Sequence, residues 1–308
     1  MPLPAQCPIC SAEHHVQSVV SRHVYGGKKG QAIFHCEQCD IRYLHPGLSH
    51  EEEAKLYAEE FEKFMEKRSS HDAGWETPEA HIEANAREAA RRSAFLLSRL
   101  PARGKVLEIG CSSGFMLHEL KAKGYDCVGV EPSGVFSDYV KHRGIACFNS
   151  LDDLLFDPAH ADGFDVVLHY YVMEHISEVT EFLDRQIHML KPSGIIVFEV
   201  PNATDALSSL YDIAAYEKFI WVVSHRWYFS TRSMEHLLRG FGMEFEIHMD
   251  QRYDLSNHLT WAIDGRPGGH GRFTNELGQD LEDHYKRALV AAGKGDTLTV
   301  VVRNAPCP

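Results

Sequence analysis

The sequence predicts an α/β protein built on a doubly wound parallel sheet, with a small cysteine-rich unit at its N-terminus. Three observations lead to this prediction. Apolar, strand-like runs alternate with amphipathic helical patterns between residues 105 and 200, which is typical of parallel βαβ units. A glycine-containing turn at 110–114 follows the first of these strands. Two C-x-x-C pairs precede the whole region, at 7–10 and 36–39.

The size and composition of the chain predict a globular protein. With 308 residues, 44% of them hydrophobic, it can fill a substantial core. No run approaches the roughly 20 apolar residues of a membrane-spanning helix, and the N-terminus lacks a secretory signal pattern, so we expect no membrane partner and a cytoplasmic location. The net charge of −13 argues against a broad nucleic-acid surface, because phosphate binding depends on clustered Lys and Arg.

The two C-x-x-C pairs predict a metal site. Four thiolates form the tetrahedral set that Zn²⁺ favours and leave no position open for water or substrate, so we expect a structural ion. The segment between the pairs has the pattern of two short strands joined by a Gly-Gly-Lys-Lys-Gly turn, and a third strand follows the second pair. Residues 1–50 are therefore predicted to form a zinc ribbon that folds around its ion. The predicted ligands are Cys7, Cys10, Cys36 and Cys39.

Residues 51–100 are predicted to form a helical linker or lid. The stretch 49–68 begins with Ser49 as a plausible N-cap, has acidic residues in its first turn and carries apolar residues on one side, which is typical of an amphipathic helix. After a polar break, residues 79–100 repeat the pattern. We expect these helices to pack on the domain that follows them.

The turn after the first strand of the sheet predicts a ligand site. Strand, glycine turn and helix together bring backbone N–H groups against a small polar ligand at the carboxyl edge of a parallel sheet. The second strand, at 125–130, is followed by Glu131, 21 positions beyond Gly110. At that distance an acidic residue receives the hydroxyl groups of a ribose, so the pattern predicts an adenosine-type ligand.

A dinucleotide is the first alternative for this site. Its enzymes require G-x-G-x-x-G, so that the pyrophosphate can approach the helix N-terminus. In this chain Ser112 occupies the position of the second glycine of that motif, and Phe115 occupies the position of the third. A nicotinamide-dependent oxidoreductase is therefore the weaker interpretation.

Four stretches of the chain resemble motifs of class I S-adenosylmethionine-dependent methyltransferases. They are VLEIGCSSG, VGVEPS, FDVVLHYYVMEHI and LKPSGIIVFEVPN, and the resemblance covers roughly residues 80–250. It implies a Rossmann-like sheet of seven strands, a methyltransferase core at 101–250 with a substrate insertion near 201–230, and S-adenosylmethionine as cofactor. By resemblance, the methionine part of the cofactor is surrounded by Glu108, Gly110, Cys111, Ser112 and Gly114. The ribose and adenine are bordered by Glu131, Pro132, Ser133, Asn149, Ser150 and Leu151.

The strand at 164–169 is predicted to deliver its end to the ligand crevice. There His169 and Tyr170 would face the sulfonium, and Glu174 and His175 would begin the wall of an acceptor pocket. The alternative is that Glu174 starts the next helix and His175 packs beneath it.

The stretch HRWYFS at 225–230, with the four cysteines, resembles the zinc-carrying methyltransferases of deoxysugar pathways. Those enzymes show a Glu-His pair, whereas Ser224 precedes His225 here, and this departure from their pattern favours O-methylation over C-methylation. Transfer to oxygen requires in-line placement and a base that takes the hydroxyl proton. We predict His225 as this base, with packing near Tyr228 as its alternative role and His175 as the next candidate.

The C-terminal region, 251–308, is interpreted as an acceptor-binding loop, a helix over 275–292 and a last strand over 297–303 that pairs with the strand at 243–249. The alternative for the loop is an ordinary surface loop. The predicted acceptor contacts are Glu174, Tyr228, Asn257 and His258. The expected acceptor is a small polar molecule, most plausibly a sugar or sugar nucleotide. The alternatives are a C- or N-methyltransferase acting on another metabolite, and a non-enzymatic protein that docks partners through its ribbon; the oligomeric state is left open.

Overall fold

The structure is a computed structural model that describes residues 3–57, 61–68 and 74–303. The chain divides into two compact units. One unit combines residues 1–49, 173–180 and 199–300, and the other combines residues 50–172, 181–198 and 301–308. The functional division predicted from the sequence, into ribbon, linker, methyltransferase core and C-terminal region, stays a prediction.

A seven-stranded sheet carries the fold, and its strand order is β10-β11-β8-β7-β4-β5-β6. The predicted doubly wound α/β sheet is thereby confirmed, because β4 pairs in parallel with both β5 and β7, and β5 pairs in parallel with β6. The last strand, β11, lies next to β10, as expected. The strands are β4 (Lys105–Ile109), β5 (Asp126–Val130), β6 (Ala146–Phe148), β7 (Phe164–Tyr170), β8 (Leu190–Pro201), β10 (Glu244–Asp250) and β11 (Thr297–Arg303).

The register of the central strands brings their carboxyl ends to one edge. Ile109 at the end of β4 lies opposite Val130 of β5 and His169 of β7. The residues that follow these strand ends therefore emerge together, at the edge where open α/β sheets bind ligands. These strands read as continuous apolar runs because parallel strands are buried on both faces. Their core side chains include Val106, Val166, Leu168 and Val197, with Leu96, Leu117 and Leu120 from the helices.

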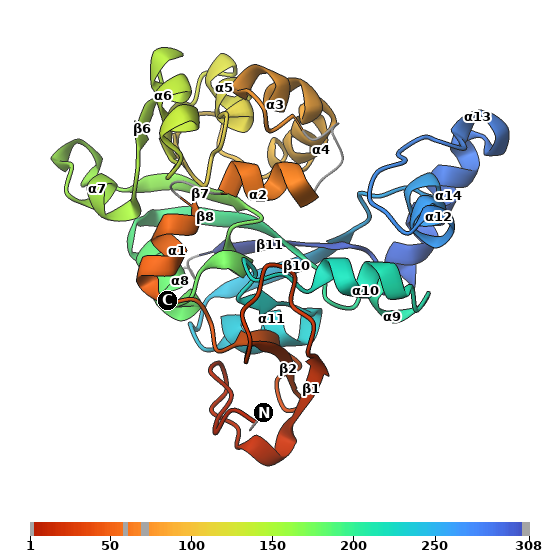
Figure 1. Ribbon diagram of the computed structural model, residues 1–308. Helices are drawn as coiled ribbons and strands as arrows, with labels where there is room; N and C mark the ends of the chain where they lie inside the picture. The colour runs from red at the N-terminus through yellow and green to blue at the C-terminus, as the bar shows by residue number, and fades with distance from the viewer. Residues whose placement is uncertain (1–2, 58–60, 69–73, 304–308) are drawn as a thin grey trace. The chain divides into compact units, whose positions relative to one another are not determined.

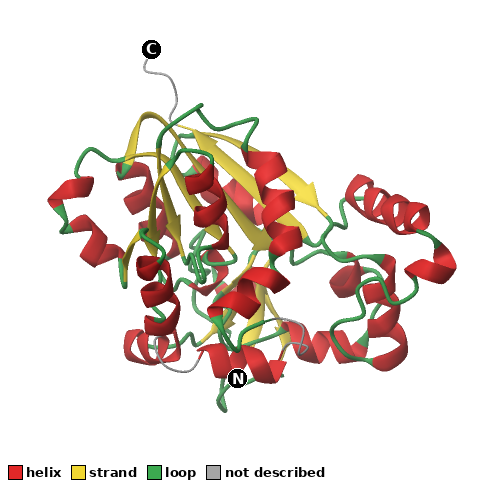
Figure 2. Ribbon diagram, turned by 90° about the horizontal axis from the view of Figure 1, so that it is seen from above, coloured by secondary structure: helices red, strands yellow, loops and turns green. Residues whose placement is uncertain are grey.

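Helices accompany the parallel strands, as Figure 2 shows. Helices α3, α4, α5 and α6 lie beside one another (Figure 1). The helix expected over 79–100 is split at Asn85, and the helix expected over 49–68 is described as two helices with residues 58–60 outside the described part. The helices are α1 (His50–Lys55), α2 (Phe61–Arg68), α3 (Pro78–Ala84), α4 (Ala86–Leu96), α5 (Phe115–Ala122), α6 (Gly134–His142), α7 (Leu151–Leu155) and α8 (Val179–His188).

The cysteine-rich unit is built on a four-stranded antiparallel sheet of order β1-β2-β3-β9. Its first three strands, β1 (Gln17–Ser21), β2 (Ala32–Cys36) and β3 (Arg42–His45), are those that the ribbon pattern predicts. The fourth, β9, is only Trp227–Tyr228 and pairs with Tyr43 and Arg42. Two residues are too few to show a strand periodicity, so the sequence gives no sign of this pairing.

The C-terminal region differs from its interpretation as a loop. Residues Leu255–Asp264 form helix α12, which begins at the N-cap Asp254, whose carboxylate accepts the Asn257 N–H, and ends at Gly265 with φ 65°. An Asp N-cap and a left-handed Gly C-cap are ordinary helix signals, and the glycine-rich stretch that follows obscured them. The remaining helices are α9 (Ala206–Ser209), α10 (Ala214–Ile220), α11 (Thr231–Arg239), α13 (Thr274–Leu277) and α14 (Gln279–Ala291).

Candidate functional site

The turn after β4 has the backbone conformation that a close ligand approach requires. Gly110, Ser112 and Gly114 all have positive φ, at 69°, 49° and 69°. At Gly110 a Cβ atom would lie 2.5 Å from Cγ2 of Val172, so both the left-handed conformation and the packing demand glycine. Ser112 adopts the same region despite its side chain, and the N–H groups of Gly110 and Cys111 donate to the Val130 carbonyl at the end of β5.

Glu131 connects this turn to the end of β5. Its Oε2 accepts the Ser112 N–H at 2.7 Å and its Oε1 accepts the Ser133 N–H at 2.9 Å. The residue is only 9% exposed, so these contacts hold the carboxylate in one orientation. A carboxylate oxygen can accept more than one hydrogen bond, and the arrangement is therefore compatible with a ribose hydroxyl pair binding to the same group.

The buried groups next to the turn fit a polar ligand. Among the described residues, Glu108 Oε2 and Ser112 Oγ are buried and have no hydrogen-bond partner. Burial raises the pKa of Glu108 to about 8, with Arg92 opposing the shift. Unpaired buried polar atoms are rare in folded proteins, and a cofactor that brings an ammonium group and hydroxyl groups would supply the missing partners.

Arg92 is a residue of this region that the sequence patterns missed. It is buried on α4, and its guanidinium carbon lies 4.0 Å from the centroid of the Tyr170 ring. The positive charge of Arg92 therefore lies against one of the predicted sulfonium-facing residues. It is also close enough to Glu108 to oppose the rise in pKa that burial causes there. In sequence it looks like one of several surface arginines of an amphipathic helix.

His81 contacts the turn from the predicted linker. Its Nδ1 lies 2.9 Å from Ser113 Oγ, and its ring packs 4.6 Å from the ring of Trp75 and 5.5 Å from that of Phe136. Burial lowers the pKa of His81 to about 4, so the imidazole is neutral at physiological pH. The segment before α4 thus supports the glycine turn directly, a contact that periodicity cannot reveal.

The predicted adenine border lies around Asn149. Its Nδ2 donates to Ser137 Oγ at 3.1 Å, and its Oδ1 lies 3.4 Å from Lys141 Nζ. Ser150 caps α7, its Oγ accepting the Asp153 N–H at 3.1 Å. These contacts fix the two side chains within the protein, and their contact with adenine stays a prediction, as do the roles of Pro132 and Leu151.

His169 is fully buried within β7. Its ring stacks on Phe198 with centroids 4.6 Å apart, and burial lowers its pKa to about 3. The neutral ring therefore belongs to the apolar core, and of the two predicted sulfonium-facing residues Tyr170, at the very end of the strand, stands nearer the carboxyl edge. Cys111 is also buried, with its sulfur 3.9 Å from that of Cys147.

Three of the predicted acceptor-side residues come together in the other unit. Glu174, His175 and His225 each place one nitrogen or oxygen atom within 4.8 Å of the others. His175 Nδ1 lies 2.8 Å from the Ser224 carbonyl oxygen; because a carbonyl only accepts, Nδ1 carries the proton. The two imidazole rings lie 4.8 Å apart at 82°.

Two members of this cluster, Glu174 and His225, are buried. Glu174 is 1% exposed, and burial raises its pKa to about 8, with Arg252 opposing the shift. The two chain segments are connected by Trp227, whose Nε1–H donates to the Ile176 carbonyl at 2.7 Å. Another predicted acceptor contact, Tyr228, lies with its ring 5.5 Å from that of His225, but its hydroxyl accepts the Val222 N–H at 2.8 Å.

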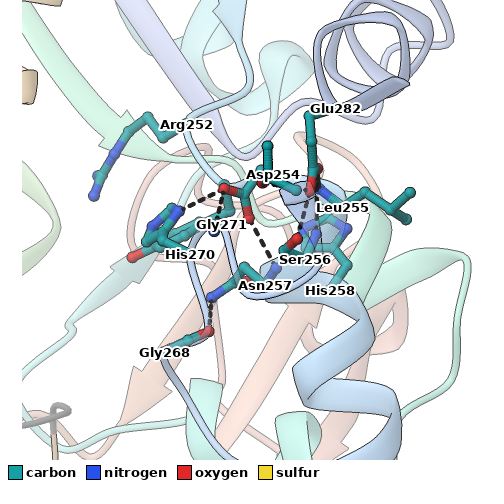
Figure 3. A network of polar contacts seen from close by, with 12 residues as sticks. Arg252, Asp254, Leu255, Ser256, Asn257, His258, Gly268, His270, Gly271 and Glu282 are labelled. Carbon is teal, nitrogen blue, oxygen red and sulfur yellow. Dashed lines mark hydrogen bonds and ion pairs between the residues drawn. The ribbon is translucent and has the colours of Figure 1, made fainter. Parts of the chain in front are cut away.

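Asn257 and His258 lie in a separate polar network on α12 (Figure 3). Asn257 Nδ2 donates to the Gly268 carbonyl at 2.7 Å, and His258 Nδ1 lies 2.6 Å from the Tyr285 hydroxyl. Asp254 accepts the Gly271 N–H at 3.1 Å and lies 3.2 Å from His270. These contacts hold the glycine-rich loop against α12 and α14, so both predicted residues have structural partners, and acceptor contact stays a prediction for them.

The cysteine sulfurs are arranged as a metal site requires. Cys7 and Cys39 sulfurs lie 3.7 Å apart, and those of Cys10 and Cys36 lie 3.6 Å apart. All four fall within 4.8 Å of one another. Tetrahedral Zn²⁺ with bonds of about 2.3 Å separates its sulfur ligands by about 3.8 Å, so the four thiolates fit this ion.

A family model described as "Methyltransferase domain" matches residues 81–246. The chain belongs to this methyltransferase family. The matched segment contains the glycine turn, Glu131 and Tyr170, so the family prediction is confirmed for the region in which the sequence motifs lie.

Relatives extend this finding. A ubiquinone biosynthesis O-methyltransferase of Rhodopseudomonas palustris is 27% identical over 146 residues, which cover 45% of this chain and 58% of that protein. The enzyme of the same name from Azorhizobium caulinodans is 32% identical over 144 residues, covering 41% of this chain and 53% of that protein. The chain thus spans little more than half the length of these curated relatives. The similarity to deoxysugar-pathway enzymes is not among these findings.

A solved structure shows the same fold. The SAM dependent methyltransferase from Archaeoglobus fulgidus superimposes with a TM-score of 0.51 at 16% sequence identity, covering 71% of this chain and 94% of that chain. The predicted fold class is thereby confirmed. Among the described residues, no helix is both long and apolar enough to cross a membrane.

Proposed function

We propose that this protein transfers the methyl group of S-adenosylmethionine to a hydroxyl group of a small polar acceptor. The observation that carries the proposal is the Glu131 carboxylate, held by the Ser112 and Ser133 N–H groups at the carboxyl edge of the sheet. A buried acid fixed at this place is suited to a ribose. The alternative of a nicotinamide-dependent enzyme has no support from the family to which the chain belongs.

The residues around the turn have distinct proposed roles. Glu131 receives the ribose hydroxyl groups, and Ser112 and Glu108 bind polar groups of the methionine part. Arg92, beside Tyr170, keeps a positive charge close to Glu108. When bound, the cofactor supplies an activated methyl group on a sulfonium, so the protein has to orient the acceptor, exclude water and remove a proton.

Proton removal is assigned to the cluster of Glu174, His175 and His225. His175 uses Nδ1 as a donor to Ser224, which leaves its Nε2 as the proton acceptor, and His225 remains the first choice for the base. Glu174 follows Tyr170 by four positions in the chain. Glu174 thus comes soon after the end of β7 in the sequence.

The acceptor class is proposed from two lines of support. The resemblance of HRWYFS and the four cysteines favours a sugar or sugar nucleotide, whereas the relatives named above are O-methyltransferases of ubiquinone biosynthesis and favour an aromatic hydroxyl. The O-methyltransferase relatives, together with Ser224 in place of the Glu of the deoxysugar enzymes, favour oxygen as the methylated atom. The four cysteines are proposed to hold a structural Zn²⁺.

Two measurements test the proposal. Isothermal titration should show binding of S-adenosylhomocysteine and none of NAD; binding of NAD alone would remove the methyltransferase assignment. Incubation with S-adenosylmethionine and separate panels of sugar nucleotides and dihydroxyaromatic compounds, followed by mass spectrometry, should show the mass gain of one methylene unit in one panel. A gain at carbon or nitrogen would overturn the assignment to oxygen.

A further inference from the structure

The cluster of Glu174, His175 and His225 has the composition of a metal site. Two imidazoles and one carboxylate present donor atoms within 4.8 Å of one another. The combination of two His and one carboxylate is a recurrent ligand set of first-row divalent ions, and it leaves coordination positions open. It differs chemically from the four-thiolate set of the ribbon, which closes its coordination sphere.

The hydrogen bonding of His175 is that of a metal ligand. Its Nδ1–H donates to the Ser224 carbonyl oxygen at 2.8 Å. Histidines that bind metals almost always donate their other ring N–H to a carbonyl or carboxylate, which fixes the tautomer and the ring orientation. The Nε2 lone pair of His175 is therefore the atom offered to the cluster.

Glu174 supplies an independent observation that points to a cation. It is 1% exposed, and its Oε2 is buried with no hydrogen-bond partner among the described residues. A buried carboxylate oxygen without a partner is costly, and buried carboxylates are normally paired with a cation or coordinate a metal. A cation between the carboxylate and the imidazoles would satisfy this oxygen.

The two segments that carry the ligands are held rigidly. Trp227 Nε1 donates to the Ile176 carbonyl at 2.7 Å, and the His225 N–H donates to the Val222 carbonyl at 3.2 Å. The contacts lie within two residues of His175 and at His225 itself, so they fix the ligand-bearing backbone without using the ligand atoms. Preorganised ligands of this kind favour metal binding, because few side chains have to be ordered when the ion binds.

We propose that Glu174, His175 and His225 form a second metal site, which binds one first-row divalent cation in addition to the ion of the four cysteines. The open positions of such an ion could bind the hydroxyl group of the acceptor; this point rests on the proposed function. The imidazole lone pairs would then coordinate the ion, so His225 would not remove the hydroxyl proton directly. The ion would instead polarise the hydroxyl group, and its proton would pass to solvent.

Cobalt is a suitable probe, because thiolate ligands give Co²⁺ intense charge-transfer absorption whereas nitrogen and oxygen ligands give only weak visible bands. The full chain, freed of metal under reducing conditions, is titrated with Co²⁺ and its bound metal is counted by mass spectrometry. We expect two equivalents, one with each spectral signature. A single equivalent with only the thiolate signature would overturn the proposal.

Matched variants locate the second equivalent. Glu174→Gln keeps the size of the side chain, and both it and His225→Ala should lose the weak-band equivalent while retaining the thiolate one. His248→Ala changes a half-exposed histidine of β10 and should retain both. If both cluster variants still bound two full equivalents of Co²⁺, the second ion would lie elsewhere and the assignment would be contradicted.

Binding of S-adenosylhomocysteine is measured on the same samples. Retained binding in Glu174→Gln shows that the chain is folded, and it keeps the metal result separate from the methyltransferase proposal. Loss of the second equivalent with intact nucleoside binding supports the site. If the wild type binds two equivalents but no S-adenosylhomocysteine, the metal site stands and the proposed function fails.

Discussion

The cofactor edge and the Glu174–His175–His225 cluster are built in opposite ways. At the cofactor edge, Gly110 and Glu131 directly follow two adjacent parallel strands, and the register of those strands is enough to bring them together. The cluster joins residues 50 positions apart through irregular segments, connected by single hydrogen bonds such as that of Trp227. The arrangement at the cofactor edge is a consequence of topology, whereas the cluster depends on individual side chains. Single substitutions should therefore disrupt the cluster more easily than the cofactor edge.

Removal of a ribbon cysteine should produce the largest effect on the free energy of folding. Cys36→Ser removes one of four proposed ligands, and structural zinc sites contribute on the order of 10 kcal/mol to folding. Strand β3 pairs with β9 at Tyr43–Trp227, two residues beyond His225. We therefore expect turnover to fall by about 10-fold or more, by analogy with the loss of supporting shells around active sites, while binding of S-adenosylhomocysteine is retained.

The control for this experiment is the wild-type protein stripped with a chelator. Its turnover should fall in the same way and return when Zn²⁺ is added back, which separates loss of the ion from damage by the substitution. Full turnover in Cys36→Ser would instead favour a ribbon that only docks partners.

Substitution of His225 tests the cluster itself. Because a general acid or base contributes about 100- to 10,000-fold to rate, His225→Ala should lower kcat within that range and leave the affinity for S-adenosylhomocysteine unchanged. Steady-state kinetics and calorimetry together measure both quantities, with His248→Ala as the matched histidine control. Wild-type turnover in His225→Ala would exclude this residue as either base or metal ligand.

Glu131→Ala tests the opposite side of the comparison. The substitution removes the acceptor of two backbone N–H groups and of the proposed ribose hydroxyls. Charged hydrogen bonds contribute about 1.5 to 3 kcal/mol each, so the Kd for S-adenosylhomocysteine should rise by about 10- to 100-fold. The control is Asp126→Ala, at the exposed start of the same strand; an equal loss of affinity there would mean that the effect is one of strand stability.

The difference between the two regions also explains what the sequence could predict. The strands β4, β5 and β7, the glycine turn and Glu131 are local patterns joined by the regular geometry of parallel strands. Strand β9, the contact of His81 with Ser113 and the burial of Arg92 depend on tertiary packing between segments of distant sequence, and no periodicity encodes such packing. Helix α12 is a different case, because its caps at Asp254 and Gly265 were present in the sequence.

The proximity of Glu174 and His225 could be predicted from the sequence only in part. The sequence placed Glu174 on the acceptor side, because side chains that leave the end of a parallel strand point toward the ligand crevice. It placed His225 there through the resemblance of the HRWYFS stretch to known methyltransferases. It could not show that the Ser224 carbonyl fixes the tautomer of His175, since that contact joins backbone and side chain across 49 positions. The chemistry of the site was therefore accessible in outline, and its hydrogen-bond pattern was not.

Acid should weaken the cofactor edge and the α12 network, and this is the smallest of the expected effects. Burial lowers the pKa of His81 and of His258 to about 4 from an ordinary value of 6.5. Since the folded pKa is the lower one, each imidazole stabilises the fold fully above pH 6.5 and this contribution is lost as the pH falls toward 4. Linkage gives about 1 to 2 kcal/mol per histidine between pH 7 and pH 5, measurable by urea unfolding. His81→Phe and His258→Phe should each reduce the slope, and an unchanged slope in either variant would show that its histidine is hydrated and titrates normally.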